Sequence, residues 1–333
     1  MYFIGIDGGG SATRAVVINE QREVLGRGDA GPSSHYAVGP AAAATACRQA
    51  AVAAIKSARD MHEEFDPSEI RAWGFGLAGV RREADQEMMN GFVDKICDVP
   101  FILETDVVAA HAGAFAGDPG IVVSAGTGAI TLGADEFGEQ FYADGWGPLL
   151  GDEGGGYWIG VEALRAICRA LDGRAHSTAL TEPIFKLLDV ADGAELVQFI
   201  YSERCTRNDI ARIAEVVFEL ADDGIAEAVE IRARAASNMA RSVRSVARAL
   251  LQRRRDRALE NNEKDAQPLE MLVALRGGVF EDDFMRATLG FAAAEAMVEL
   301  KRDYLPIASW RVVKPQHDAA VGAAILAQLL VWN

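Results

Sequence analysis

The sequence predicts an α/β fold of two domains, and three observations support this prediction. The chain has 333 residues, more than the size at which a single hydrophobic core keeps growing. In its first third, apolar runs of strand length alternate with helix-like segments, as in a sheet covered by helices. A pattern of strand, glycine turn and strand occurs twice, at residues 3–18 and 121–133. The repetition indicates a duplicated domain with a cleft between its halves.

The expected first domain begins with the strand pair of residues 3–18. Apolar runs bounded by turn residues predict its strands, and alanine-rich or amphipathic stretches predict its helices. The further elements are, in chain order, a strand near Val24, a helix at 40–61, a strand at 72–77, a helix at 83–97 and a strand at 101–104.

The expected second domain begins near residue 118 with the second hairpin and is mostly helical after residue 151. A long helix at 224–255 ends in a basic run, which is most simply its solvated end. The polar stretch at 260–267 predicts an exposed loop. The remaining elements are a strand at 269–275, a helix at 282–302 and an alanine-rich helix at 318–330.

Each hairpin turns through residues with little or no side chain, namely Gly8, Gly9, Gly10 and Ser11 in the first and Gly126, Thr127 and Gly128 in the second. Backbone N–H groups at such a turn can surround an anion, above all a phosphate. An ordinary hairpin with a bulge needs the same residues, so either turn alone has a structural alternative. Two such turns, with the hydroxyls of Ser11, Thr13 and Thr127, favour facing hairpins that hold a polyphosphate.

Asp7 stands at the end of the first strand, beside the first turn. A carboxylate repels a phosphate unless a cation lies between them, so Asp7 predicts Mg²⁺ held largely through water. The turn is not a Walker A loop, because no Gly-Lys-Ser or Gly-Lys-Thr follows it. It is not a dinucleotide fingerprint either, because it leads into a strand and not into a helix.

Asp106 follows an apolar strand and starts a helix. The structural alternative is an N-cap, the more common use of Asp at such a position. The functional alternative places its carboxylate at the carboxyl end of a strand, where open sheets bind ligands. There Asp106 could accept the proton of a substrate hydroxyl that attacks the γ-phosphorus.

Residues 145–156 read GWGPLLGDEGGG. So many glycines are costly in backbone entropy for a plain loop, and they favour a backbone that approaches a ligand closely. Asp152 and Glu153 would then offer acceptors to sugar hydroxyls or to a hydrated metal. Gly277 and Gly278 stand between a strand and a helix, where they form either a plain turn or a surface that admits the flat face of a base.

Composition argues against several functions. A net charge of −16 argues against a nucleic-acid partner, because binding to a phosphate backbone needs a basic surface. The four cysteines form no CxxC pair, which argues against a zinc site or disulfides and predicts buried thiols. No segment is long enough to span a membrane, and the N-terminus runs directly into a strand. We therefore expect a soluble, cytoplasmic protein.

The chain contains, in order, the segments IGIDGGGS, GLAG, TD, SAGTG, GWGPLLGDEGGGYWIG and RGGV. Together they resemble the N-acetylglucosamine kinases and the related BadF/BadG/BcrA/BcrD ATPases of the sugar kinase, Hsc70 and actin superfamily. The resemblance covers nearly the whole chain. It implies two ribonuclease H-like, actin-like ATPase domains, at residues 1–115 with about 318–333 and at 116–317. It also implies a homodimer, ATP with Mg²⁺ in the cleft, and γ-phosphoryl transfer to the 6-hydroxyl of an amino sugar.

The resemblance assigns roles to individual residues. Asp7 would organise Mg²⁺, and Asp106 would be the catalytic base. The two glycine turns, with Ser11, Thr13 and Thr127, would bind the phosphates, and Gly277 and Gly278 would lie against the adenosine. The sugar would be bound by Ser34, His35, Asp106, Ala129, Gly145, Trp146, Gly147, Asp152 and Glu153.

Two positions depart from the family pattern. Ser34, His35 and Tyr36 stand where N-acetylglucosamine kinases usually have Asn-His-Trp or Asn-His-Tyr, and Ala129 replaces the serine of the usual GTGS segment. Each lost hydrogen-bonding group would change specificity by roughly 1–3 kcal/mol if it is buried against the sugar. N-acetylglucosamine and glucosamine therefore stand as candidates beside N-acetylmuramic acid and other amino sugars.

Two other functions remain open on the sequence alone. An activator ATPase of a 2-hydroxyacyl-CoA dehydratase or a benzoyl-CoA reductase would need cysteines for an iron–sulfur cluster, and the four cysteines lack a matching arrangement. A nucleotide-dependent switch would act on a protein partner. Asp106 with a glycine-dense acidic segment favours a small acceptor instead.

Overall fold

The computed structural model describes residues 1–262, 269–302 and 307–332. The chain forms two compact units. The first comprises Met1–Val122, Ala134–Glu139 and Lys314–Asn333, and the second comprises Val123–Gly133 and Gln140–Val313. The domain boundaries predicted from the sequence stay a prediction, because a compact unit is not by itself an independently folding domain.

The first unit is built on a five-stranded mixed sheet in the order β3-β2-β1-β4-β5. β2 is antiparallel to both β1 and β3, whereas β1, β4 and β5 are parallel to one another. The hairpin predicted at the N-terminus therefore lies within this sheet. The strands are β1 (Tyr2–Gly8), β2 (Thr13–Asn19), β3 (Val24–Ala30), β4 (Ile70–Leu77) and β5 (Phe101–Thr105).

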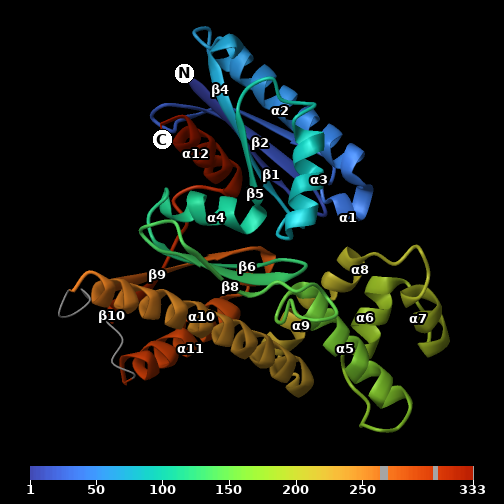
Figure 1. The fold of residues 1–333 in the computed structure, drawn as a ribbon. Helices are drawn as coiled ribbons and strands as arrows, with labels where there is room; N and C mark the ends of the chain where they lie inside the picture. Colours follow the sequence, from blue (N-terminus) through green and yellow to red (C-terminus); the bar gives the residue numbers. More distant parts are fainter. Residues whose placement is uncertain (263–268, 303–306, 333) are drawn as a thin grey trace. The chain divides into compact units, whose positions relative to one another are not determined.

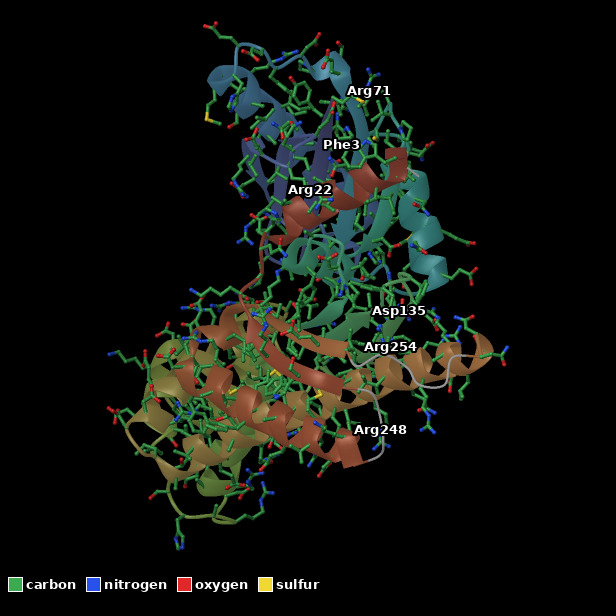
Figure 2. The ribbon with its side chains drawn as sticks, turned by 90° about the vertical axis from the view of Figure 1, so that its left-hand side faces the viewer. Phe3, Arg22, Arg71, Asp135, Arg248 and Arg254 are labelled. Carbon is green, nitrogen blue, oxygen red and sulfur yellow. The ribbon has the colours of Figure 1, made fainter. Side chains whose placement is uncertain are left out.

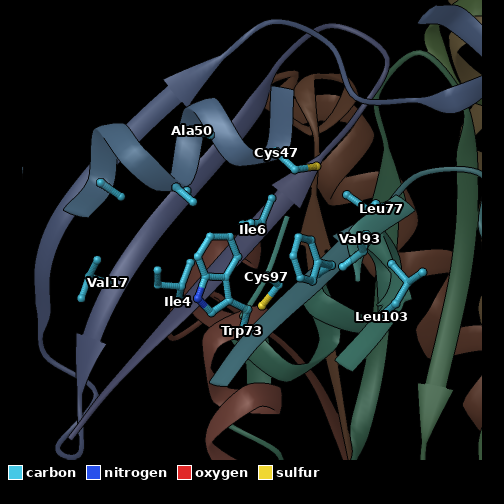
Figure 3. Packing of buried hydrophobic residues seen from close by; sticks show 14 of the residues in the cluster. Ile4, Ile6, Val17, Cys47, Ala50, Trp73, Leu77, Val93, Cys97 and Leu103 are labelled. Atoms are coloured by element: carbon cyan, nitrogen blue, oxygen red, sulfur yellow. The ribbon is translucent and has the colours of Figure 1, made fainter. Parts of the chain in front are cut away.

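Helices cover both faces of this sheet (Figure 1), and alternate residues of its strands belong to different apolar clusters. Ile4 belongs to an apolar cluster with residues of α2 (Pro40–Met61) and α3 (Glu83–Val93), which Figure 3 shows from close by. Phe3 belongs to a second cluster with α12 (Ala319–Trp332) on the other face. This alternation is the period of two that a β-strand imposes on its side chains.

Glycines allow α12 to approach the sheet and α4 (Asp106–Phe115) closely. A Cβ on Gly74 of β4 would lie 1.9 Å from the carbonyl oxygen of Ala323, and a Cβ on Gly322 would lie 1.9 Å from that of Ala109. Backbone therefore packs directly on backbone at both contacts. The packing fixes the position of α4, at whose start Asp106 stands.

Gly322→Ala is expected to lower the free energy of unfolding by about 1–3 kcal/mol or more, because its methyl group would overlap a backbone carbonyl that has no room to move. Urea unfolding measures the effect. Gly290→Ala is the matched control, since Gly290 lies in a helix and a Cβ there meets no atom within 4 Å; it should be neutral or stabilising. Equal stability of the two variants would contradict the packing argument.

Side chains also attach α12 to the first unit. Arg22, between β2 and β3, reaches α12, where its Nε donates to Gln328 Oε1 at 3.0 Å (Figure 2). The rings of Phe3 and Trp332 meet edge to face with centroids 6.5 Å apart. The last helix of the chain thus completes the unit that the first strand begins.

The second sheet has the order β10-β9-β6-β7-β8, and most of it lies in the second unit. Its strands are β6 (Gly120–Ala125), β7 (Ala129–Ala134), β8 (Gln140–Asp144), β9 (Leu269–Arg276) and β10 (Ile307–Val313). The helices of the unit are α5 (Gly156–Leu171), α6 (Thr181–Leu188), α7 (Gly193–Ile200), α8 (Arg207–Ala211), α9 (Ile213–Asp222), α10 (Ala226–Glu260), the short η2 (Gly278–Glu281) and α11 (Asp283–Arg302).

The predicted α/β fold is confirmed, with differences at the ends of elements. The helix predicted at 83–97 ends at Val93, because the chain turns there and Cys97 Sγ donates to the Val99 carbonyl at 3.3 Å. β8 and β10 are not predicted from the sequence. The loop predicted at 260–267 falls mostly outside the described residues.

The prediction of buried cysteines is right for Cys47 and Cys97, wrong for the exposed Cys168, and only partly right for the half-buried Cys205. Burial raises the pKa of Cys47 to about 12 and that of Cys97 to about 11, which keeps both thiols protonated and unreactive. In the part of the chain that the structure describes, no helix is long and apolar enough to cross a membrane.

His111 makes the stability of α4 dependent on pH. Its ring is buried and its Nε2–H donates to the Gly120 carbonyl at 3.0 Å, and burial lowers its pKa to about 4. In the unfolded chain the imidazole binds a proton near pH 6.5, whereas in the folded chain it does so only near pH 4. The free energy of unfolding therefore falls as the pH drops from about 6.5 to about 4.

The loss attributable to His111 should reach roughly 3 kcal/mol at the acid end of this window. His111→Gln keeps an N–H donor and does not titrate, so its urea unfolding should depend less on pH over this range. Other groups titrate in both proteins and cancel in the comparison. Parallel pH dependence of variant and wild type would contradict this assignment.

Candidate functional site

The turn between β1 and β2 is held by its own backbone and by the segment after β3. The Gly9 N–H donates to the Ala12 carbonyl at 3.0 Å, and the Gly9 carbonyl accepts from the N–H groups of Ser33 and Ser34 at 3.0 and 3.1 Å. A Cβ on Gly8 would lie 2.1 Å from Ser33 Oγ. The predicted phosphate turn therefore lies against the predicted sugar-binding segment at Ser34.

Side chains around this turn differ in accessibility. Asp7 is only 9% exposed, whereas Ser11 is exposed and a Cβ on Gly10 would meet no atom within 4 Å. Thr13 is fully buried, and its hydroxyl donates to the Gly31 carbonyl at 2.6 Å. The hydroxyl expected to bind phosphate is thus bound to the backbone instead, so Thr13 fixes the turn.

Thr105, and not Asp106, is the N-cap of α4. The Thr105 Oγ1 accepts from the Val108 N–H at 3.3 Å, so the capping alternative for Asp106 is wrong. Asp106 is the first helical residue and is half-buried. Its carboxylate lies in the first turn, where the helix dipole stabilises a negative charge.

Asp7 and Asp106 come from the same edge of the first sheet. Asp7 pairs with Gly76 of β4, which pairs with Glu104 of β5, and Asp106 follows two residues later. One strand separates β1 from β5, which puts their backbones about 10 Å apart. Burial raises the pKa of Glu104. Asp7, Glu104 and Asp106 thus occupy backbone positions near the end of the parallel strands.

An aspartate that the sequence analysis missed holds the segment containing Ser34 in place. Asp85 of α3 contacts His35 Nε2 at 3.3 Å, and accepts from the Tyr36 hydroxyl at 2.6 Å and from Arg82 Nε at 2.7 Å. Burial alone would raise the pKa of Asp85, but these hydrogen bonds hold it below its usual value. His35 is itself buried, so its ring supports α1 (His35–Val38).

The turn between β6 and β7 contacts the N-terminus of α5. The Gly156 N–H donates to the Gly126 carbonyl at 2.7 Å, and the Tyr157 N–H donates to the Thr127 carbonyl at 2.9 Å. Gly126 is exposed, and Thr127 and Gly128 are half-buried. The second glycine turn and the end of the glycine-rich loop therefore form one structural element.

Asp144, also missed by the sequence analysis, anchors the glycine-rich loop that follows it. Its Oδ1 accepts from the N–H groups of Gly145 at 2.8 Å and Asp152 at 2.7 Å, and its Oδ2 accepts from that of Glu153 at 2.8 Å. Asp152 Oδ1 accepts from the Gly147 N–H at 3.1 Å. Two carboxylates thus connect the beginning of the loop to its end.

The predicted sugar-binding residues differ in exposure. Trp146 is 67% exposed, Glu153 is exposed and Asp152 is half-buried. Burial, together with the negative charge of Asp144, raises the pKa of Asp152. Ala129 is only 4% exposed, so its methyl group offers almost no surface to a sugar.

A pocket of about 730 Å³ lies within the second unit, beside the second glycine turn. Gly126, Thr127 and Gly156 line one part of it. Residues of α8, α9, η2 and the start of α11 line the rest, including Phe218 and Phe284. Its volume lies within the range of roughly 300–1,000 Å³ that is typical of small-molecule sites.

Gly277 and Gly278 have different surroundings. Gly277 has a left-handed φ of 105°, and a Cβ there would lie 2.2 Å from the Ala125 carbonyl oxygen, so it packs against the end of β6. Gly278 lines the pocket, and a Cβ there would meet no atom within 4 Å. Only Gly278 therefore offers open backbone to a ligand.

Among the residues described, no three or more His, Cys, Asp or Glu side chains are grouped so that they could hold a metal ion. A magnesium ion does not need such a group, because it keeps several waters and is usually bound through one or two carboxylates and substrate phosphates. Asp7, buried beside an open glycine turn, fits that manner of binding.

Comparisons with known proteins agree with one another. Residues 4–327 match the model of the BadF/BadG/BcrA/BcrD ATPase family. The chain is 29% identical to an N-acetyl-D-glucosamine kinase of Dictyostelium discoideum over 67% of this chain and 72% of that protein. It is 26% identical to an N-acetylmuramic acid/N-acetylglucosamine kinase of Clostridium acetobutylicum over 98% of each. A solved structure of a candidate N-acetylglucosamine kinase from Chromobacterium violaceum has 28% identity and a TM-score of 0.73, with 98% of both chains covered.

Proposed function

Because the chain belongs to the BadF/BadG/BcrA/BcrD ATPase family, we propose that it is an ATP-dependent kinase that transfers the γ-phosphoryl group to the 6-hydroxyl of an amino sugar. The observation that carries this proposal is the pocket of about 730 Å³ that the second glycine turn lines. Relatives that match this chain over most of their length are kinases of N-acetylglucosamine.

The pocket fits a nucleotide in both chemistry and size. Its glycine turn and the start of α5 offer backbone without bulky side chains, which suits phosphates. Its other walls contain aromatic side chains and carboxylates, which suit a base and the hydroxyls of a ribose. We therefore assign the phosphates to Gly126 and Thr127, and the nucleoside to the region of Gly278.

In the first unit, Asp106 is the proposed catalytic base. Its carboxylate can accept the proton of the sugar hydroxyl as that oxygen attacks phosphorus. Thr105 already caps α4, so the helix does not need Asp106 as its cap. Gly8, Gly9, Gly10 and Ser11 are proposed to contact phosphate. Asp7 would hold Mg²⁺ through water, and the ion would neutralise charge on the phosphates.

The sugar is proposed to contact Ser34 and the loop containing Gly145, Trp146, Gly147 and Asp152. Asp85 and Asp144 hold these two segments in defined conformations, as a selective site requires. N-acetylglucosamine or glucosamine is the substrate we favour. Ser34 cannot provide the amide group of the usual asparagine, so N-acetylmuramic acid is a further candidate. We expect a homodimer.

The test is ATP consumption by the purified protein with Mg²⁺, alone and with N-acetylglucosamine, glucosamine, N-acetylmannosamine or N-acetylmuramic acid. Strong stimulation by one sugar, with its 6-phosphate as the product, would support the kinase and identify its substrate. Slow hydrolysis that no sugar stimulates would overturn the proposal in favour of a switch ATPase that acts on a protein partner.

A further inference from the structure

We propose that Phe284 is the stacking platform for the nucleobase in the pocket of the second unit, and that Arg232 is the residue that positions it. This inference rests on the proposed function and deepens it, because it names side chains that select the nucleoside. Phe284 lines the pocket and is 38% exposed. The Arg232 guanidinium carbon lies 4.2 Å from the centroid of its ring.

Arg232 is held on three sides. Its side chain is 5% exposed, and it forms ion pairs with Asp222 at the end of α9 and, at 3.3 Å, with Asp282 beside η2. Asp282 also accepts from the Met285 N–H at 2.7 Å, which fixes the first turn of α11. A buried arginine with two carboxylate partners keeps one orientation. The ring that it contacts is thereby restrained in the pocket wall.

A flat aromatic ligand matches this arrangement. The guanidinium lies over the Phe284 ring, and the same side chain lines the pocket. Stacking of a base on an aromatic side chain is favourable for any base, because every base has a π-face. A cation behind the ring restrains it without using the surface that the base would cover.

The charges around the pocket favour one orientation of a bound nucleotide. The charged lining residues of the pocket are Arg212 and the carboxylates of Glu215, Glu219, Asp222, Glu281, Asp282 and Asp283; Asp222 and Asp282 are the two that pair with Arg232. The carboxylates accept hydrogen bonds from ribose hydroxyls or from an exocyclic amine, but they repel phosphates. The glycine turn at Gly126 has no such charge. A nucleotide therefore binds with its phosphates at this turn and its base at Phe284.

The experiment is titration calorimetry of ATP binding to the full-length protein. Phe284→Ala should weaken ATP binding by roughly 5- to 20-fold, because it removes the stacking surface. Phe284→Tyr should bind ATP within about two-fold of wild type, since it keeps the ring. Phe291→Ala is the matched control, because Phe291 also lies on α11 and is 76% exposed; it should leave ATP binding unchanged.

Binding of inorganic tripolyphosphate distinguishes the loss of base stacking from a general loss of structure in the pocket. Tripolyphosphate has no base, so Phe284→Ala should bind it as the wild type does. Arg232→Lys keeps the charge but loses the planar contact with the ring, and it should weaken ATP more than tripolyphosphate. Equal ATP affinity of Phe284→Ala and wild type, or an equal loss for ATP and tripolyphosphate, would overturn this inference. A wild-type protein that binds no ATP would overturn the proposed function itself.

Discussion

Asp106→Asn is expected to lower the turnover number by about 10²–10⁴-fold, the usual contribution of a positioned general base. The amide keeps the size of the carboxyl group but cannot accept the proton of the attacking hydroxyl at neutral pH. Thr105 caps α4 in the variant as in the wild type, so the helix should persist. Sugar-dependent ATP consumption measures the change, and ATP binding should stay within about two-fold of wild type.

Asp118→Asn is the matched control for Asp106→Asn. Asp118 is exposed just beyond the other end of α4, so its substitution removes the same charge from the same unit without touching the site. It should keep near-normal turnover. If Asp106→Asn also turned over normally, Asp106 would play no part in proton transfer, and the kinase mechanism would need another base.

Local sequence patterns were sufficient for much of the fold. The strand pair around Gly9 and the helix α2 form where the sequence predicts them, because glycine, Pro40 and the apolar period act over a few residues. The same local patterns predict both glycine turns and the carboxylates at the strand ends. The cap of α4 does not follow from them, because Asp106 is the capping residue that the sequence suggests and the neighbouring Thr105 is also a good one.

The residues that position the site were not predictable in this way. Asp85 holds a segment about fifty positions earlier in the chain, and Arg232 pairs with Asp282 about fifty positions later. Such partners become visible only when the fold brings them together. Asp144 is different, because an Asp-Gly pair is a local turn signal. Its reach to Glu153, however, depends on the whole course of the loop.

Asp144→Ala is expected to disorder the glycine-rich loop and to lower kcat/KM for the sugar by about 100-fold. The substitution leaves three backbone N–H groups without their charged acceptor, and each bond to a charged group contributes about 1.5–3 kcal/mol. Stability should fall by several kcal/mol at most, since solvent can reach part of the loop. Asp144→Asn should be milder, because its carbonyl can still serve Gly145 and Asp152.

Backbone strain must be separated from the lost hydrogen bonds, because Asp144 has a left-handed φ of 65° that alanine tolerates poorly. Asp189 supplies the control: it is exposed, has a φ of 54° and lies at the end of α6 in the same unit. Asp189→Ala should lower the free energy of unfolding through the same backbone strain, but it should leave KM for the sugar unchanged. If only Asp144→Ala raised KM for the sugar, and ATP affinity were unchanged, the result would support a role of the loop in sugar binding. If both variants behaved alike, the anchor would serve stability alone.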